Sequence, residues 1–172
     1  MSDGSEDQAR LARAIALAEA SPEQLLCVVG PTASGKTALA VALAERLGGE
    51  VISADSVQIY TGFDVGSGKP SPEERARAPH HLVSVRDPHE AIDAAAFATM
   101  AEAAIADVRA RGKRPIVCGG TFFWVRSLVL GLVDAPPADP EVRARHRALV
   151  DEHGRAALHA ELARVDPASA AR

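Results

Sequence analysis

The sequence has few residues of the kinds that would place it in a special class of protein. Its 172 residues include only two cysteines and six aromatic side chains. No uninterrupted apolar run reaches the roughly 18 residues that a membrane-spanning helix needs. The first residues, MSDGSEDQAR, are acidic, whereas a secretory signal peptide is basic and then apolar. We therefore expect one soluble, cytoplasmic protein that makes no contact with a membrane.

The cysteines and the net charge argue against a disulfide framework, a metal site and a strongly basic nucleic-acid-binding surface. Cys27 and Cys118 each lie inside an apolar run, which predicts small buried side chains and argues against a disulfide framework or a metal site. The neighbouring His80 and His81 lack metal-ligand spacing, so we expect structural roles for them. A formal net charge of −4 does not provide the basic surface on which nucleic-acid binding normally rests. Only the segment from Glu141 onward is slightly basic, with six arginines against five acidic residues.

Alternating apolar runs and helical patterns predict an α/β fold, specifically a P-loop NTPase-like doubly wound parallel sheet. The expected strands cover 25–29, 51–54, 82–85 and 116–118. Helices are expected over 9–20, 37–47 and 93–112. The strand at 25–29 is a continuous apolar run, which is typical of a strand buried on both faces.

Three parts of the chain are predicted from these patterns. Residues 1–24 form an N-terminal extension that we expect to be dispensable, and residues 25–134 form the P-loop α/β core. Residues 135–172 read as the start of a helical insertion, with helices broken at Gly154 and at Asp166-Pro167. The sequence Asp-Ala-Pro-Pro at 134–137 is the expected linker between core and insertion.

The strongest functional signal is a complete phosphate-binding loop. It fits the pattern G-x-x-x-x-G-K-[ST] between a predicted strand and a predicted helix, with the residues Gly30, Pro31, Thr32, Ala33, Ser34, Gly35, Lys36 and Thr37. In such a loop, backbone N–H groups and a helix N-terminus surround an anion. Lys36 neutralises phosphate charge, and the Thr37 hydroxyl can bind Mg²⁺. The motif predicts binding of a diphosphate or a nucleotide, such as ATP, with Mg²⁺ as cofactor.

Two further features bear on which phosphate is bound. No predicted strand ends in the apolar run and aspartate that hold Mg²⁺ in motor proteins and GTP switches, so classical ATPase or GTPase function is disfavoured. Asp55 follows the second strand, where its carboxylate faces the phosphate loop as a general base or caps a turn. A second glycine-rich stretch, 66–70, is predicted to be a loop, in which Lys69 is a candidate for an extra anion contact.

Six groups of residues follow one another in a definite order over about residues 25–170. They are Gly30–Thr37, Ser53–Tyr60, Asp64–Gly66 with Lys69-Pro70, Pro79–Leu82 with Arg86–Pro88, Gly119–Thr121 and Asp139–Arg143. Together they resemble the tRNA dimethylallyltransferases, also called tRNA isopentenyltransferases. The resemblance implies transfer of a dimethylallyl group from dimethylallyl diphosphate to N6 of the adenosine 3′-adjacent to a tRNA anticodon. It also implies that Mg²⁺ is required.

The resemblance assigns roles to individual residues. Lys36 and Thr37, with Mg²⁺, would stabilise the diphosphate leaving group, and Asp55 would accept the proton of the attacking amine. Contacts with tRNA are implied for Asp55, Ser56, Val57, Gln58, Thr121 and Arg143. A solvated helix face remains the alternative for Arg143. The aromatic run 122–124 either packs in the core or stacks on an extruded base.

This sequence also departs from the family pattern. Trp124 stands where the family usually has tyrosine, and Gly68 replaces a more usual alanine. The family pattern continues beyond Arg172, so we expect the chain to stop within the helical insertion that binds tRNA. The expected partners are the tRNA anticodon loop and dimethylallyl diphosphate, and the expected state is a monomer. Two alternatives stay open: a small-molecule or nucleotide kinase, and a phosphate-binding fragment without activity.

Overall fold

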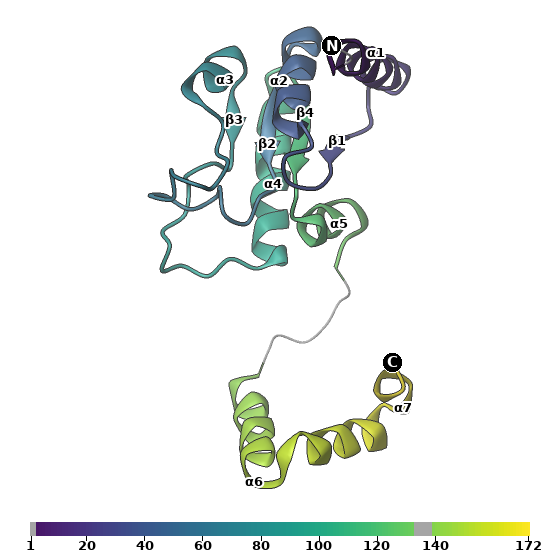
Figure 1. The fold of residues 1–172 in the computed structure, drawn as a ribbon, viewed down its shortest axis with the longest axis vertical. Coiled ribbons are helices and arrows are strands. Elements are labelled where there is room, and N and C mark those ends of the chain that lie inside the picture. Colours follow the sequence, from purple (N-terminus) through teal and green to yellow (C-terminus); the bar gives the residue numbers. More distant parts are fainter. Residues whose placement is uncertain (1–2, 133–138) are drawn as a thin grey trace. The chain divides into compact units, whose positions relative to one another are not determined.

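Four parallel strands form the centre of the larger part of the chain (Figure 1). They are β1 (Leu26–Val29), β2 (Gly49–Ser53), β3 (His80–His81) and β4 (Arg114–Gly119), in the order β1-β4-β2-β3. The structure is a computed structural model that describes residues 3–132 and 139–172. It divides the chain into two compact units, 1–132 and 133–172. Because the strands are parallel, their carboxyl ends meet at one edge of the sheet, where such folds bind ligands.

Helices cover both faces of this sheet and create two hydrophobic cores. The helices of this unit are α1 (Asp3–Ala20), α2 (Lys36–Leu47), α3 (Pro72–Arg77), α4 (Ala94–Ala110) and α5 (Phe122–Leu130). Helix α2 buries Val41 and Leu43 in one core, against Val51 and Ile116 of the sheet. Helices α4 and α5 bury Phe97 and Trp124 in the other core. The predicted doubly wound α/β fold is therefore confirmed.

Two predictions about strands are wrong. Strand β1 lies at an edge of the sheet and Val29 is 47% exposed, so this strand is not buried on both faces. No strand forms over 82–85, because Leu82 and Ser84 have φ of 59° and 56°, which is left-handed backbone that cannot continue a strand. The third strand is the short pair His80–His81 just before them.

Two helices were not predicted. Helix α3 is short and is held by a capping box, in which Ser71 accepts from the Glu74 N–H and the Glu74 carboxylate accepts from the Ser71 N–H. Helix α5 is rich in aromatic and β-branched residues, whose intrinsic preference is for strands. Packing decides its conformation: the ring of Trp124 stacks on that of Phe97 in α4, with centroids 4.5 Å apart.

Helix α1 begins at Asp3, six residues before the predicted start, and is fixed to the core. Its apolar residues Leu11 and Ile15 pack against the core on the α2 side of the sheet. The Arg114 guanidinium, on β4, donates hydrogen bonds of 2.9 Å to the carbonyls of both Ser21 and Gln24. The extension is thus held by packing and by hydrogen bonds, which the sequence did not predict.

The second unit is helical. Helix α6 (Pro140–Val165) is interrupted at Gly154, where φ is 79° and ψ is 170°, and α7 (Pro167–Ala170) follows Asp166. Both predicted breaks are therefore confirmed. The predicted linker at 134–137 and the boundary after residue 134 lie outside the described residues. In the described parts of both units, no helix is long and apolar enough to cross a membrane.

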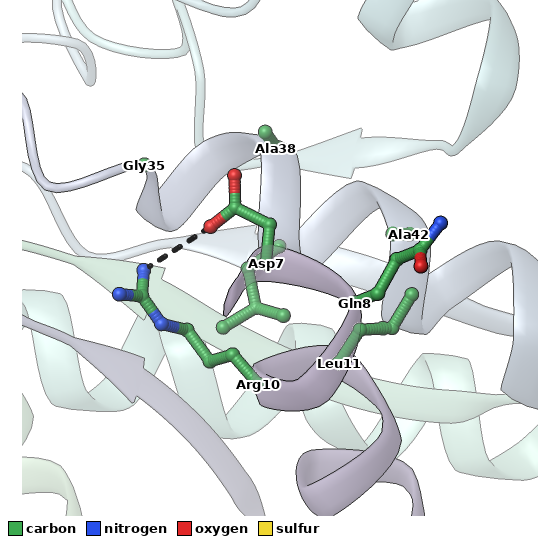
Figure 2. A pocket seen from close by; sticks show the side chains of 8 residues that line it. Asp7, Gln8, Arg10, Leu11, Gly35, Ala38 and Ala42 are labelled. Atoms are coloured by element: carbon green, nitrogen blue, oxygen red, sulfur yellow. Dashed lines mark ion pairs between the residues drawn. The ribbon is translucent and has the colours of Figure 1, made fainter. Parts of the chain in front are cut away.

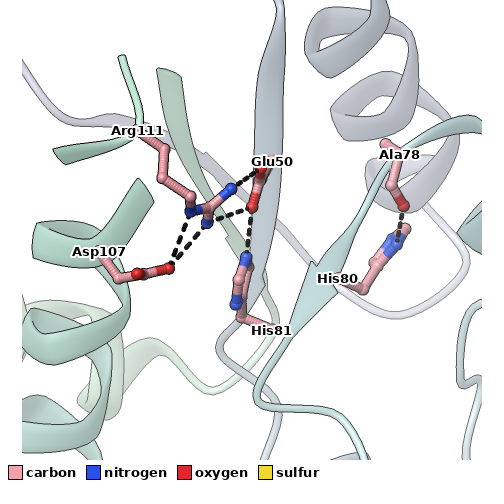
Figure 3. A network of polar contacts seen from close by, with 6 residues as sticks. All are labelled: Glu50, Ala78, His80, His81, Asp107 and Arg111. Atoms are coloured by element: carbon pink, nitrogen blue, oxygen red, sulfur yellow. Dashed lines mark hydrogen bonds and ion pairs between the residues drawn. The ribbon is translucent and has the colours of Figure 1, made fainter. Parts of the chain in front are cut away.

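A buried carboxylate connects three elements at the end of the sheet where β2 begins (Figure 3). Glu50, 5% exposed, accepts hydrogen bonds from both terminal nitrogens of Arg111, one of them 2.8 Å long, and lies 2.6 Å from His81 Nε2. Arg111 follows α4 and also pairs with Asp107 at 2.8 Å. The hydrogen bonds from Arg111, with that from His81, lower the pKa of Glu50 to about 2. His81 thus has the expected structural role, and His80 contacts the Ala78 carbonyl.

This network makes stability depend on pH. The pKa of Glu50 is lowered on folding from an ordinary value of roughly 4.3, so its ion pairs stabilise the fold above that pH. The stabilisation is lost as the pH falls toward about 2, the folded pKa. We expect Glu50→Gln to lower the free energy of unfolding at pH 7 by about 1–3 kcal/mol, because Arg111 loses its charged acceptor.

Urea unfolding at pH 7 and at pH 4 would check this expectation. The Gln variant should lose less stability between the two pH values than the wild type does. Glu45→Gln is a matched control, because Glu45 pairs with Arg77 on the surface at 2.7 Å and such pairs contribute little. Equal destabilisation by the two substitutions would contradict the assignment.

Candidate active site

The phosphate loop connects the end of β1 to the start of α2. Gly35 and Ala33 have φ of 78° and 62°, and this left-handed backbone turns the chain sharply before the helix. Ser34 Oγ and Lys36 Nζ both donate to the Pro31 carbonyl, at 2.8 and 2.5 Å, which closes the loop on itself. The N-cap Gly35 has no side chain to bond the first N–H groups of α2. These donors are therefore available to an anion.

A cavity of about 330 Å³ lies beside this loop at the carboxyl edge of the sheet. Four segments line it: the phosphate loop with Lys36 and Thr37, the turn 55–58, the loop 66–68, and the end of β4 at 118–120. The predicted anion-binding and acid–base groups therefore share one cavity. A smaller cavity of about 210 Å³ lies between α1 and α2, with the Asp7–Arg10 ion pair among its lining residues (Figure 2). Neither Lys36 nor Asp55 lines that smaller cavity.

Asp55 caps a turn and also lines the cavity, and its role as a general base stays a prediction. Its Oδ1 accepts hydrogen bonds from the N–H groups of Val57 and Gln58, at 2.9 and 3.2 Å, and so caps the turn after β2. The residue also lines the cavity that the phosphate loop lines. Within the described residues, Oδ2 forms no hydrogen bond with the protein. One oxygen thus fixes the carboxylate, and the other can accept a proton.

Direct contacts connect the other expected site residues to this turn. Thr121, at the start of α5, accepts from the Ser56 N–H at 3.0 Å, although the two residues are 65 positions apart. Gln58 accepts from Ser53 Oγ at 3.0 Å and donates to the Gly68 carbonyl at 2.7 Å. The fold therefore brings together the turn 55–58 and Thr121, for which the resemblance implies contacts with tRNA.

The end of β4 approaches β2 so closely that only glycine fits at one position. A Cβ atom on Gly119 would lie 2.1 Å from the Ala54 carbonyl oxygen, far inside van der Waals contact. Cys118 precedes it and lines the cavity, which the sequence did not predict. Its position before Gly119-Gly120, at a strand end, was the available signal. Burial raises the pKa of the Cys118 thiol to about 11, so this side chain is a neutral lining group.

Lys69 does not reach into the cavity as an anion contact. Its side chain is 5% exposed, and its ammonium donates to the Tyr60 carbonyl at 2.8 Å and to Asp64 Oδ1 at 2.9 Å. The expectation of an extra phosphate contact is therefore wrong, because the Lys69 ammonium is already paired with Asp64 and Tyr60 within the loop.

The remaining expected residues divide between core, surface and the second unit. Trp124 is buried, whereas Phe122 and Phe123 are 69% and 58% exposed, so the aromatic run is not all core. Arg143 lies on α6 with its side chain exposed. It belongs to the second unit, and its role in binding tRNA stays a prediction.

Comparison with known proteins identifies the family. The family model for IPP transferase matches residues 58–172, which is more than half of the chain. The chain belongs to the IPP transferase family. Two curated relatives named tRNA dimethylallyltransferase come from Sorangium cellulosum and Anaeromyxobacter dehalogenans. The Sorangium protein is 70% identical over 91% of this chain, and the Anaeromyxobacter protein is 61% identical over 87% of it. This chain spans about half the length of each relative.

Solved structures of family members share the fold. A full-length tRNA isopentenylpyrophosphate transferase from Bacillus halodurans is 41% identical, with a TM-score of 0.63 over 87% of this chain and 50% of that chain. A eukaryotic dimethylallyltransferase acting on tRNA is 29% identical, with a TM-score of 0.71 over 85% of this chain and 36% of that chain. The P-loop-like α/β core of this IPP transferase family member is thus that of its relatives.

The cavity of this family member also suits a magnesium ion that is shared with a phosphate. Among the described residues, no three His, Cys, Asp or Glu side chains gather in one metal cage. Mg²⁺ at phosphate sites needs only one or two protein oxygens, because phosphate oxygens and waters complete its octahedron. Thr37, in the first turn of α2, lines the cavity, and its hydroxyl would be such an oxygen.

Proposed function

We propose that this chain transfers a dimethylallyl group from dimethylallyl diphosphate to N6 of the adenosine 3′-adjacent to a tRNA anticodon. The observation that carries the proposal is that the phosphate loop and Asp55 line the same cavity. Such a cavity can hold a diphosphate leaving group and accept a proton from a nucleophile. The names of the curated relatives support the same reaction.

The donor diphosphate would bind in the phosphate loop. The N–H groups at the start of α2 are available to an anion, and Lys36 can exchange its bond with the Pro31 carbonyl for a bond with a phosphate oxygen. Mg²⁺ held by Thr37 and the phosphates would supply further positive charge. These groups stabilise the negative charge that develops as the bond between the allylic carbon and the diphosphate oxygen breaks.

The acceptor adenosine would bind in the same cavity, beside Asp55. The bond between N6 and the allylic carbon forms as the electron pair of the broken carbon–oxygen bond leaves with the diphosphate. The proton released from N6 passes to Asp55, whose Oδ1 is held by the turn and whose Oδ2 remains available. The turn 56–58 and Thr121 would contact the adenosine and the RNA around it. Arg143 would contact the tRNA from the second unit.

Two reactions run in parallel test this proposal. In the first, the chain is mixed with tRNA, labelled dimethylallyl diphosphate and Mg²⁺, and digestion of the tRNA should find the label on adenosine N6. In the second, the chain is mixed with ATP and candidate small-molecule acceptors, and no phosphoryl transfer is expected. Phosphorylation in the second reaction without prenylation in the first would replace the proposal with a kinase.

Binding of tRNA should be weak and should depend little on salt. The net charge of −4 offers few phosphate contacts, and each contact adds about 0.9 to the slope of log K against log salt. If Arg143 is one of these contacts, Arg143→Gln should reduce the slope by about 1. Arg164→Gln is a matched control in the same unit, because Arg164 is paired with Glu161 at 2.8 Å. Filter binding over a salt series measures both, and identical slopes for the two variants would remove Arg143 from the interface.

A further inference from the structure

The loop between Tyr60 and Lys69 forms one wall of the active-site cavity. Its residues 66–68 line the cavity together with the phosphate loop and the turn at Asp55. Gly62, Gly66 and Gly68 have φ of 75°, 76° and 65°, which is left-handed backbone that glycine adopts readily. A loop of this composition has many conformations in an unfolded chain, and some contact must select one of them.

Lys69 makes contacts that select this conformation. Its ammonium donates to the carbonyl of Tyr60, where the loop begins, and to the carboxylate of Asp64 in its middle. Lys69 itself lies at the end of the loop, so one charged group joins its start, middle and end. The side chain is 5% exposed. Burial of an ammonium is costly unless it is paired and hydrogen-bonded, as it is here.

A second set of hydrogen bonds connects residue Gly68 of this wall to strand β2. Gln58 Nε2 donates to the Gly68 carbonyl at 2.7 Å, while Oε1 of the same amide accepts from Ser53 Oγ at the end of β2. The start of the loop is also fixed, because the Thr61 N–H donates to the Arg86 carbonyl at 2.8 Å. Among the described residues, Lys69 is the only side chain that forms a hydrogen bond or ion pair with Asp64 in the middle of this loop.

We propose that Lys69 is a positioning residue of the diphosphate site. Through its bonds to Tyr60 and Asp64 it holds residues 66–68 as a preformed wall of the cavity that the phosphate loop also lines. It does not touch the ligand, and it acts by removing the cost of ordering the loop when the ligand binds. The identity of the ligand as a diphosphate rests on the proposed function.

Inorganic pyrophosphate with Mg²⁺ tests this proposal by calorimetry on the full chain. Lys69→Met keeps the length of the side chain but removes its charge, and we expect pyrophosphate affinity to fall by roughly tenfold. Asp64→Asn should weaken binding in the same direction. The double variant should bind no more weakly than Lys69→Met alone, because the two groups act as one unit. Lys113→Met, at an exposed lysine in the turn after α4, is the matched control and should bind as the wild type does.

Hydrogen exchange separates positioning from a general loss of stability. In Lys69→Met, the amides of 62–68 should exchange faster, while those of β2 and β4 keep wild-type rates. Wild-type pyrophosphate affinity in Lys69→Met would overturn the proposal, as would faster exchange throughout the sheet. Because pyrophosphate binding needs neither tRNA nor an allylic group, failure of dimethylallyl transfer alongside normal pyrophosphate binding would count against the proposed function alone.

Discussion

Replacing Asp55 with asparagine should slow dimethylallyl transfer by roughly 10²- to 10⁴-fold, the usual contribution of a general base. Asparagine keeps an oxygen that can accept from the N–H groups of Val57 and Gln58, so the turn after β2 should persist. What the amide cannot do is accept the proton that leaves the attacking amine. Binding of dimethylallyl diphosphate should therefore stay close to that of the wild type.

Single-turnover transfer to tRNA and calorimetry with the donor measure these two quantities separately. Asp87→Asn is a matched control: Asp87 caps a turn in the same way, accepting from the His89 N–H at 2.8 Å, but does not line the cavity. The control should transfer at the wild-type rate. An Asp55→Asn variant as active as the control would reduce Asp55 to a turn cap.

Replacing Lys36 with alanine should abolish measurable binding of the diphosphate. Lys36 is the only cationic side chain in the phosphate loop, and two bound phosphates carry charge that the backbone N–H groups alone neutralise poorly. The loop itself should survive, because the bond from Ser34 Oγ to the Pro31 carbonyl and the left-handed Gly35 remain.

Calorimetry with dimethylallyl diphosphate and Mg²⁺ checks this expectation, with circular dichroism to confirm that the variant is folded. Lys113→Ala serves as the control, since this exposed lysine is remote in sequence from the loop and does not line the cavity. If the Lys36 variant bound the donor within a few-fold of the control, the cavity beside the phosphate loop would not be the donor site.

Local and periodic signals made much of this site predictable. The phosphate loop could be located because its glycines, lysine and threonine are adjacent in sequence and lie between a strand and a helix. Asp55 could be placed opposite it because carboxyl ends of parallel strands share one edge of a sheet. Thr121 and Ser56 were named only through the family resemblance, and the contact between them was not predicted.

Features that depend on contacts distant in sequence, or on backbone conformation, were missed. Lys69 appeared to be a free cation because nothing in the sequence shows that it bonds the Tyr60 carbonyl. The apolar residues near Leu82 suggested a strand, but their burial comes from an irregular segment with positive φ. Helix α5 has strand-forming residues and is helical because Trp124 packs on Phe97.

The affinity of this chain for dimethylallyl diphosphate relative to ATP, measured by calorimetry with Mg²⁺, tests the central claim most directly. Both ligands carry a diphosphate unit that the phosphate loop can bind. The difference in affinity therefore shows which of the two remaining groups, dimethylallyl or adenosine, the rest of the cavity binds better. We predict tighter binding of dimethylallyl diphosphate. Much tighter binding of ATP would contradict the transferase account and favour a kinase.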